Sequence, residues 1–108
     1  MSTNINNLYT KPAISGTTYL ADQRLTVDGT SGGLQFTSYT ATYVDVVDLD
    51  VQTADVMATF DDSAPTTTNG HRLYAGMAYS WSVARCNAAK FIAATATSGL
   101  IHASPSSI

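Results

Sequence analysis

The chain has 108 residues, 44% of them hydrophobic, and a net charge of −3, which fits one folded domain with one modest core. Only 12% of the residues are charged, and the five Lys and Arg residues are scattered, so no basic patch for nucleic acid is predicted. We expect no membrane span and no secretion signal, because long apolar stretches and a basic N-terminal region are both missing. Cys86 stands alone, which excludes an intrachain disulfide and fits folding in a cytosol.

The first third of the chain is predicted to be an arm followed by strands. Residues 1–16 are polar and lack periodicity, so we expect an extended N-terminal arm there and a single domain over residues 17–108. Residues 17–27 are β-prone. The Gly-rich run 28–33 is predicted to be a loop, since glycine tolerates positive φ, and residues 34–39 alternate again as a strand.

The clearest strand pattern lies in the middle of the chain. Apolar and acidic residues alternate strictly in Val47-Asp48-Leu49-Asp50-Val51, which is typical of a strand with one buried face. Val56, Ala58 and Phe60 share one face of a second strand. Residues 52–54 are expected to reverse the chain between these two antiparallel strands, although they lack the Asn-Gly or Gly-Gly of a tight hairpin.

The last third predicts shorter elements. Residues 74–83 are expected to form a strand, residues 84–89 a helical turn, residues 90–92 a further strand and residues 100–103 the final one. The absence of Glu and the scarcity of Lys remove the usual residues of helix surfaces. The predicted fold class is therefore all-β: an antiparallel, jelly-roll-like β-sandwich with an extended N-terminal arm.

Two groups of side chains raise a metal hypothesis. Asp45, Asp48 and Asp50 could bind calcium, but no Gly-containing loop is present to wrap an ion, so we favour a solvent-exposed strand face that discourages edge pairing. His71 and His102 could form a metal or acid–base pair. Nothing near either residue resembles a zinc signature, so structural roles are favoured. We predict no metal and no cofactor.

Catalytic motifs are also missing. No serine lies in Gly-x-Ser-x-Gly or in Ser-x-x-Lys. Asp61-Asp62 could suggest paired carboxylates for sugar hydrolysis, but adjacent side chains point in different directions. Turn formation explains Asp61-Asp62-Ser63-Ala64-Pro65 well, because Asp and Ser cap turns and Pro fixes φ. We therefore predict that the protein is not an enzyme.

The aromatic residues near position 80 have two interpretations. They could form a platform for a sugar or a protein partner, because aromatic side chains are enriched in interfaces. The favoured interpretation is a buried strand face, since Tyr79 and Trp81 share parity with Met77. If a partner surface exists, its predicted contact residues are Tyr74, Tyr79, Trp81, Pro65 and His71.

The second half of the chain resembles a known family. Asp55-Val56-Met57-Ala58-Thr59-Phe60-Asp61-Asp62-Ser63-Ala64-Pro65-Thr66, then Asn69-Gly70-His71-Arg72-Leu73 and Ala75-Gly76, is similar to a recurrent arrangement in small virion proteins of tailed bacteriophages. There, a strand leads into an Asp-rich turn with a Pro-Thr step, a Gly-His-x-Leu strand entry, an Ala-Gly turn and a further strand. The resemblance covers roughly residues 44–103 and departs at Asp62, where such proteins often carry Gly.

The resemblance implies an antiparallel β-sandwich that packs on a virion as a decoration, neck or tail component, with no catalytic residues. We expect a non-enzymatic bacteriophage structural protein, made in the host cytoplasm and located in the virion. Its expected partners are capsid, neck or tail subunits and further copies of itself, with a trimer as the leading form. A surface rich in Ser and Thr fits this role, because its burial costs little desolvation. A carbohydrate-binding or host-adhesion module remains the alternative.

Overall fold

The computed structural model describes residues 21–40 and 44–106. The predicted arm, residues 1–16, lies outside the described residues, and so do residues 17–20 of the first predicted strand. The predicted domain boundary between residues 16 and 17 therefore stays a prediction.

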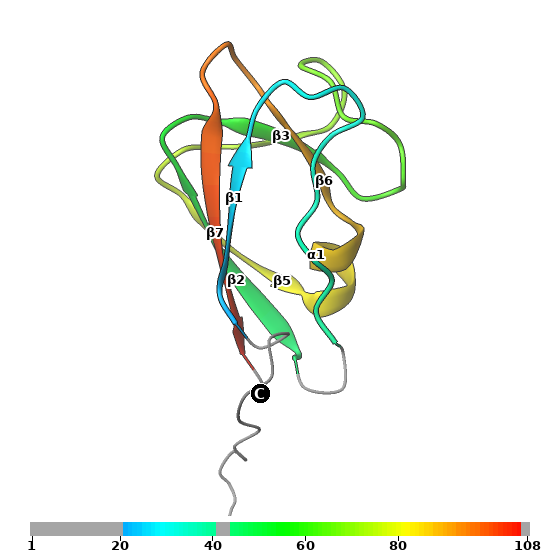
Figure 1. The fold of residues 1–108 in the computed structure, drawn as a ribbon, viewed down its shortest axis with the longest axis vertical. Helices are drawn as coiled ribbons and strands as arrows, with labels where there is room; N and C mark the ends of the chain where they lie inside the picture. Colours follow the sequence, from blue (N-terminus) through cyan, green and yellow to red (C-terminus); the bar gives the residue numbers. More distant parts are fainter. Residues whose placement is uncertain (1–20, 41–43, 107–108) are drawn as a thin grey trace, which may run out of the picture.

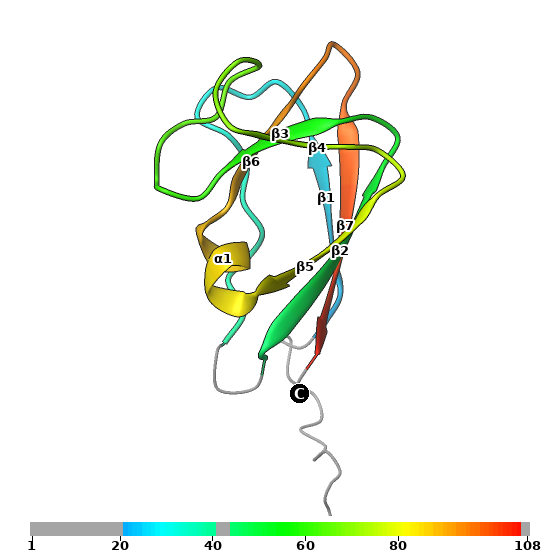
Figure 2. The same cartoon turned by 180° about the vertical axis from the view of Figure 1, so that it is seen from behind.

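Seven strands and one short helix make up the described chain (Figures 1 and 2). Their bounds are β1 (Gln23–Val27), β2 (Val46–Gln52), β3 (Val56–Thr59), β4 (His71–Leu73), β5 (Ala78–Ser82), α1 (Val83–Ala88), β6 (Lys90–Ala93) and β7 (Gly99–Ser106). All strand pairs are antiparallel, and the strands form a four-stranded sheet in the order β1-β7-β2-β5 and a three-stranded sheet in the order β4-β3-β6. The predicted all-β sandwich is confirmed.

The connections between the sheets follow the jelly-roll pattern. Leu34 forms an isolated antiparallel bridge with Phe91, on the side of β6 that faces away from β3. If this segment is counted as the second of eight, the larger sheet has the order 1-8-3-6 and the smaller sheet the order 2-7-4-5. This is the strand order of a jelly roll, with one strand reduced to a single bridge.

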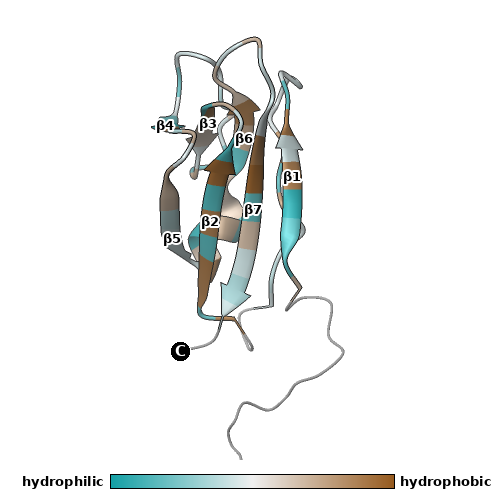
Figure 3. Cartoon of the chain, turned by 90° about the vertical axis from the view of Figure 1, so that its left-hand side faces the viewer, coloured by the Kyte–Doolittle hydropathy of each residue, from teal (hydrophilic) through white to brown (hydrophobic). Residues whose placement is uncertain are grey.

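The central strand β2 confirms the alternation seen in the sequence. Val47, Leu49 and Val51 are each at most 1% exposed, whereas Asp48 and Asp50 face solvent. β2 pairs with β5 along one edge and with β7 along the other, so register errors would turn its apolar face outward. The alternating colours of β2 in Figure 3 show this two-sided character directly.

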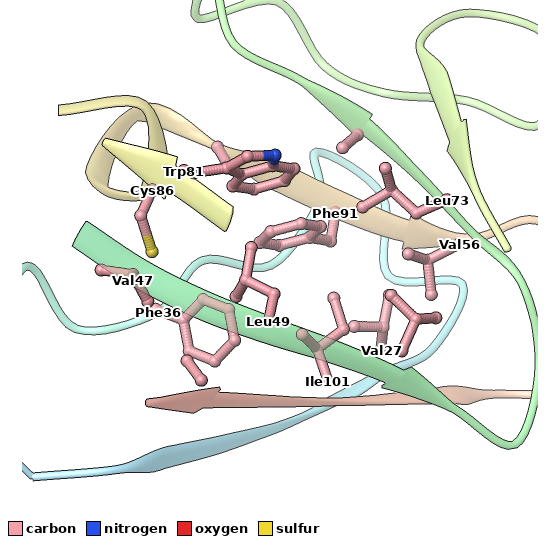
Figure 4. Close-up of a cluster of buried hydrophobic side chains, with 14 of the residues drawn as sticks. Val27, Phe36, Val47, Leu49, Val56, Leu73, Trp81, Cys86, Phe91 and Ile101 are labelled. Atoms are coloured by element: carbon pink, nitrogen blue, oxygen red, sulfur yellow. The ribbon is translucent and has the colours of Figure 1, made fainter. Parts of the chain in front are cut away.

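Aromatic rings fill the space between the two sheets (Figure 4). Trp81 of β5 stacks on Phe91 of β6, with ring centroids 6.1 Å apart and an interplanar angle of 2°. Phe36 meets Phe91 edge-on at 5.6 Å, and Phe60 meets Trp81 edge-on at 5.0 Å. These contacts connect the two sheets through one continuous core that also contains Leu49.

The predicted strand over residues 34–39 is wrong beyond its bridge at Leu34. Two side-chain amides take the place of a neighbouring strand in that segment. Gln23 accepts from the N–H of Thr37 at 2.9 Å and donates to its carbonyl at 2.8 Å, and Asn87 bonds both backbone groups of Tyr39 at 2.8 and 2.9 Å. The backbone groups are satisfied one residue at a time, so no continuous ladder forms.

Two other expectations need correction. Residues 52–54 do not form a hairpin, because β2 and β3 belong to different sheets; Thr53 makes this crossing with a φ of 75°. The predicted strand 74–83 begins only at Ala78, since residues 74–77 form a turn. The helical turn is confirmed as α1, whose N-cap Ser82 accepts a hydrogen bond from the N–H of Arg85.

The final strand extends further than the four residues predicted, to Ser106. It includes Pro105, which lies opposite Val47 of β2. The pairing with β1 ends at Ala103, so the side of β7 toward which Pro105 lacks an N–H has no strand to bond. Proline is therefore accommodated in β7 without loss of a ladder hydrogen bond.

Candidate functional site

The two sides of the sandwich differ in how their strand edges are covered. On one side, the segment after β1 runs past β6 and α1 (Figure 1), and the carbonyl of Asp28 accepts from the N–H of Ala93. On the other side lie β4, residues 74–77 and β5, which we call the open side (Figure 3). No described segment pairs with the outer edge of either strand there. The open side is the candidate contact surface.

A tight turn shapes the middle of the open side. The N–H of Met77 donates to the carbonyl of Tyr74 at 3.1 Å, and Gly76 has a φ of 87°, which defines a type II turn. Gly76 also donates to Val51 at 2.7 Å while Val51 donates to the carbonyl of Met77, which is the geometry of a bulge with glycine at its first position. The side chains of Tyr74 and Met77 are each 54% exposed.

Tyr79 and Trp81 belong to the interior of β5. Trp81 is only 8% exposed, and the Tyr79 hydroxyl accepts a hydrogen bond from the N–H of Tyr74 at 3.0 Å. The favoured interpretation of a buried strand face therefore holds for Trp81. It does not hold for Met77, which precedes the regular strand and sits in the bulge.

Pro65 and His71 take opposite positions. Pro65 is fully buried, and a Cβ on Gly33 would lie 2.9 Å from its ring. His71 opens β4, is exposed and lies beside Phe60 with ring centroids 5.5 Å apart. Of the predicted contact residues, Tyr74 and His71 reach the surface, Tyr79 is half-buried, and Trp81 and Pro65 pack inside the chain. Contact with a partner stays a prediction for the exposed residues.

A pocket of about 470 Å³ lies next to His71, between the loop that joins β3 to β4 and helix α1. It is lined by Thr59, Phe60, Asp61, Ser63, Asn69, Gly70, His71 and Arg85. The guanidinium of Arg85 lies 4.3 Å from the centroid of the Phe60 ring, which places a cation over an aromatic face. A carboxylate, an amide, an imidazole and a guanidinium thus surround one half-buried ring.

The loop beside the pocket is held by its own side chains. Asp61 accepts from the hydroxyl of Ser63 at 2.5 Å and from its N–H at 3.1 Å. The pKa of Asp61 is lowered by the Ser63 hydroxyl first, by the Ser63 N–H next, and to a smaller extent by the charge of His71. Thr59 donates to the Ser63 carbonyl at 2.6 Å, which ties the loop to β3. The turn predicted for this segment is confirmed.

The aspartate and histidine residues of the two metal hypotheses make separate contacts. Asp48 accepts a hydrogen bond from the Ser80 hydroxyl at 2.9 Å, across the strand pair. His102 lies 3.0 Å from Asp22, whereas His71 belongs to the other sheet, so the two histidines are not a pair. Within residues 21–40 and 44–106, no group of three or more His, Cys or Asp side chains is placed to hold a metal ion.

Sequence reasoning missed the pairing of Phe60 with Arg85. The sequence places Phe60 on one strand face with Val56 and Ala58, and it shows Arg85 only as one of five scattered cations. The two residues approach because the β3–β4 loop and α1 lie on the same side of the sandwich (Figure 2) and line one pocket. No local pattern carries that information, since the contact depends on the sheet topology.

Comparisons with known proteins identify no relative of this chain. No protein-family model, curated protein or solved structure matches this chain. None of the helices in the described part of the chain is long and apolar enough to cross a membrane.

Proposed function

We propose that this chain is a non-enzymatic structural protein of a bacteriophage virion, docking on the capsid, neck or tail as a decoration, cement or accessory subunit. In this proposal the protein is made in the host cytoplasm and ends in the virion. The observation that carries it is the open side, where a strand edge that no described segment pairs lies beside the exposed Tyr74 and Met77. Exposed aromatic and methionine side chains are enriched where proteins contact one another.

The resemblance to phage virion proteins also supports the proposal. Its Asp-rich turn joins β3 to β4, its Gly-His step enters β4, and its Ala-Gly step makes the turn before β5. Asp62, where such proteins often carry Gly, has a φ of 71°. Glycine favours this left-handed region and Asp tolerates it, so the departure leaves the turn intact.

Mass spectrometry of purified particles tests the proposal. The particles of the phage that encodes this chain should contain the protein in a fixed ratio to the major capsid protein. Absence of the protein from particles that are otherwise complete would refute the proposal.

A rebinding assay then maps the docking surface. Purified protein is added to particles that lack it, and binding is measured by co-sedimentation. The double variant His71→Ala/Tyr74→Ala should bind at least about tenfold more weakly, because both exposed side chains lie on the open side. Arg24→Ala is the matched control, since Arg24 is exposed on β1 at the opposite edge of the sheet. Equal loss in both variants would argue against this docking surface.

The pocket favours a second candidate, a carbohydrate-binding or host-adhesion module. Asp61, Asn69 and Arg85 offer planar polar groups around Phe60, which is a composition that suits sugar hydroxyls. A glycan-array signal that is lost in Asn69→Ala and in Arg85→Ala would support this function, as would binding of the isolated protein to host cells. Trp81 is unsuitable for this test because it is buried.

A further inference from the structure

We propose that two copies of this chain pair through the outer edges of their β5 strands, forming one continuous antiparallel sheet across a twofold axis. The inference rests on the proposed function, in that it names a second copy as one partner of an assembling protein. It concerns the backbone edge of β5 rather than the docking residues His71 and Tyr74.

The register of β5 shows which backbone groups face outward. Val51 donates to the carbonyl of Met77 at 3.1 Å, and Val83 donates to the carbonyl of Asp45 at 3.3 Å. Because the hydrogen-bonding direction alternates along an antiparallel strand, the residues with odd numbers bond to β2. The N–H and C=O groups of Ala78 and Ser80 therefore point away from the sheet, and no described segment pairs with them.

The other strand edges are protected, each in its own way. β6 is covered by the bridge to Leu34, and β1 carries the exposed, charged Arg24. β4 has only three residues and carries Arg72, which forms an ion pair with Asp55 at 2.9 Å. Short edges and charged side chains are common means of preventing strand addition.

β5 has none of these protections along its length. Residues 75–84 contain no charged residue and no proline. The outward-facing residues are Ala78, Ser80 and Ser82, all exposed and all with small side chains. A glycine bulge at Gly76 ends the regular edge on one side. An incoming strand would therefore meet backbone groups that no described segment pairs, beside small and uncharged side chains.

A second copy fits this edge better than an arbitrary strand because the edge complements itself. A twofold axis through Ser80 places it opposite its own symmetry mate, and these two residues can exchange both N–H···O bonds. The same axis places Ala78 opposite Ser82, whose N–H can donate to the Ala78 carbonyl, while the Ser82 carbonyl serves as the N-cap of α1. The same register brings the exposed Met77 next to Val83, at the start of α1 in the second copy. Pairing of this kind gives a dimer in place of the trimer expected from the sequence.

Sedimentation equilibrium of the full chain, whose mass is 11.4 kDa, tests the pairing. We expect a mass about twice that of the chain for the wild type and that of the monomer for Ser80→Pro. On the backbone, proline removes only the outward N–H of Ser80 and leaves the backbone bonds to β2 in place. Ser80→Ala is the matched control: it loses the hydroxyl bond to Asp48, as Ser80→Pro does, but keeps the N–H and should remain a dimer.

A cysteine cross-link gives a second measurement that does not depend on tolerance of proline. Ser80→Cys should form an intermolecular disulfide under mild oxidation, because the axis places the two Cα atoms within about 4.4–6.8 Å. Ser104→Cys lies on the same sheet face but in β7, two strands away from β5, and should not cross-link. The native Cys86 is 1% exposed and should not interfere.

The outcomes separate this inference from the proposed function. A monomeric wild type, a dimeric Ser80→Pro variant or equal cross-linking at positions 80 and 104 would overturn the pairing. A monomer that is nevertheless present in purified particles refutes the pairing alone. A dimer that is absent from those particles refutes the virion function alone.

Discussion

Replacing Trp81 by alanine should remove a large part of the free energy of unfolding of this protein. Trp81 is 8% exposed, stacks on Phe91 and meets the edge of Phe60. Truncation of a buried aromatic residue costs about 3–5 kcal/mol of unfolding free energy. We expect the upper half of that range, about 4–5 kcal/mol, because both aromatic contacts are lost and the cavity opens between the two sheets.

Urea unfolding followed by circular dichroism measures this loss, and the melting temperature should fall by about 15–30 °C. Tyr74→Ala is the matched control, since Tyr74 is also aromatic but is 54% exposed, and it should change stability by about 0.5 kcal/mol or less. If the two variants lost similar stability, Trp81 would not be the core residue that connects the sheets. A sugar-stacking or partner-binding role for Trp81 would then return.

Three further predictions test local features of the fold. Gly99→Ala should destabilise the protein by about 1–3 kcal/mol in urea unfolding, because the added Cβ would lie 2.6 Å from Val56. The control Gly29→Ala should be nearly neutral, since a Cβ at Gly29 meets nothing within 4 Å. The pKa of Asp55 is held below 3.8, first by the hydrogen bond from the N–H of Ala75. Its stabilising effect is therefore present above pH 3.8 and is lost as the pH falls through the folded-state pKa. Asp55→Asn should flatten the acid side of a plot of unfolding free energy against pH. Burial raises the pKa of Cys86 from 9.0 to about 11, so a thiol reagent at pH 8 should label the protein only after unfolding, and rapid labelling of the native protein would contradict the buried position.

The sequence contains enough information for the elements whose signal is local. The alternation over residues 47–51 predicted β2, and its buried residues are the ones expected. The Gly-rich residues 28–33 predicted a loop because glycine tolerates positive φ, and Gly32 and Gly33 have φ values of 91° and 84° there. Burial of one strand face and positive φ are both determined within a single segment, so the local sequence pattern can predict them.

The features that the sequence did not reveal depend on contacts between distant segments. Gln23 bonds to Thr37 across 14 residues and Asn87 bonds to Tyr39 across 48, and these side-chain bonds explain why the alternating residues 34–39 do not form a strand. The cation over Phe60 likewise comes from the helix after β5. An amide or a guanidinium has the same local pattern whether or not such a partner exists, so topology decides its role.

The pairing of β5 edges should depend on Met77 more than on any single backbone bond. A hydrogen bond that replaces one to water contributes only about 0.5–1.5 kcal/mol net, so strand addition by the backbone alone is weak. Met77 is 54% exposed in the single chain, and covering it in the dimer should contribute about 1 kcal/mol per copy. Because the axis repeats each contact, Met77→Ser should weaken the dimer by about 2 kcal/mol, or about 30-fold in Kd. Sedimentation equilibrium measures this change against Ser80→Ala, which keeps the backbone bonds and should shift Kd far less. An unchanged Kd in Met77→Ser would place the two copies in another register, since only the axis through Ser80 brings Met77 against α1 of its partner.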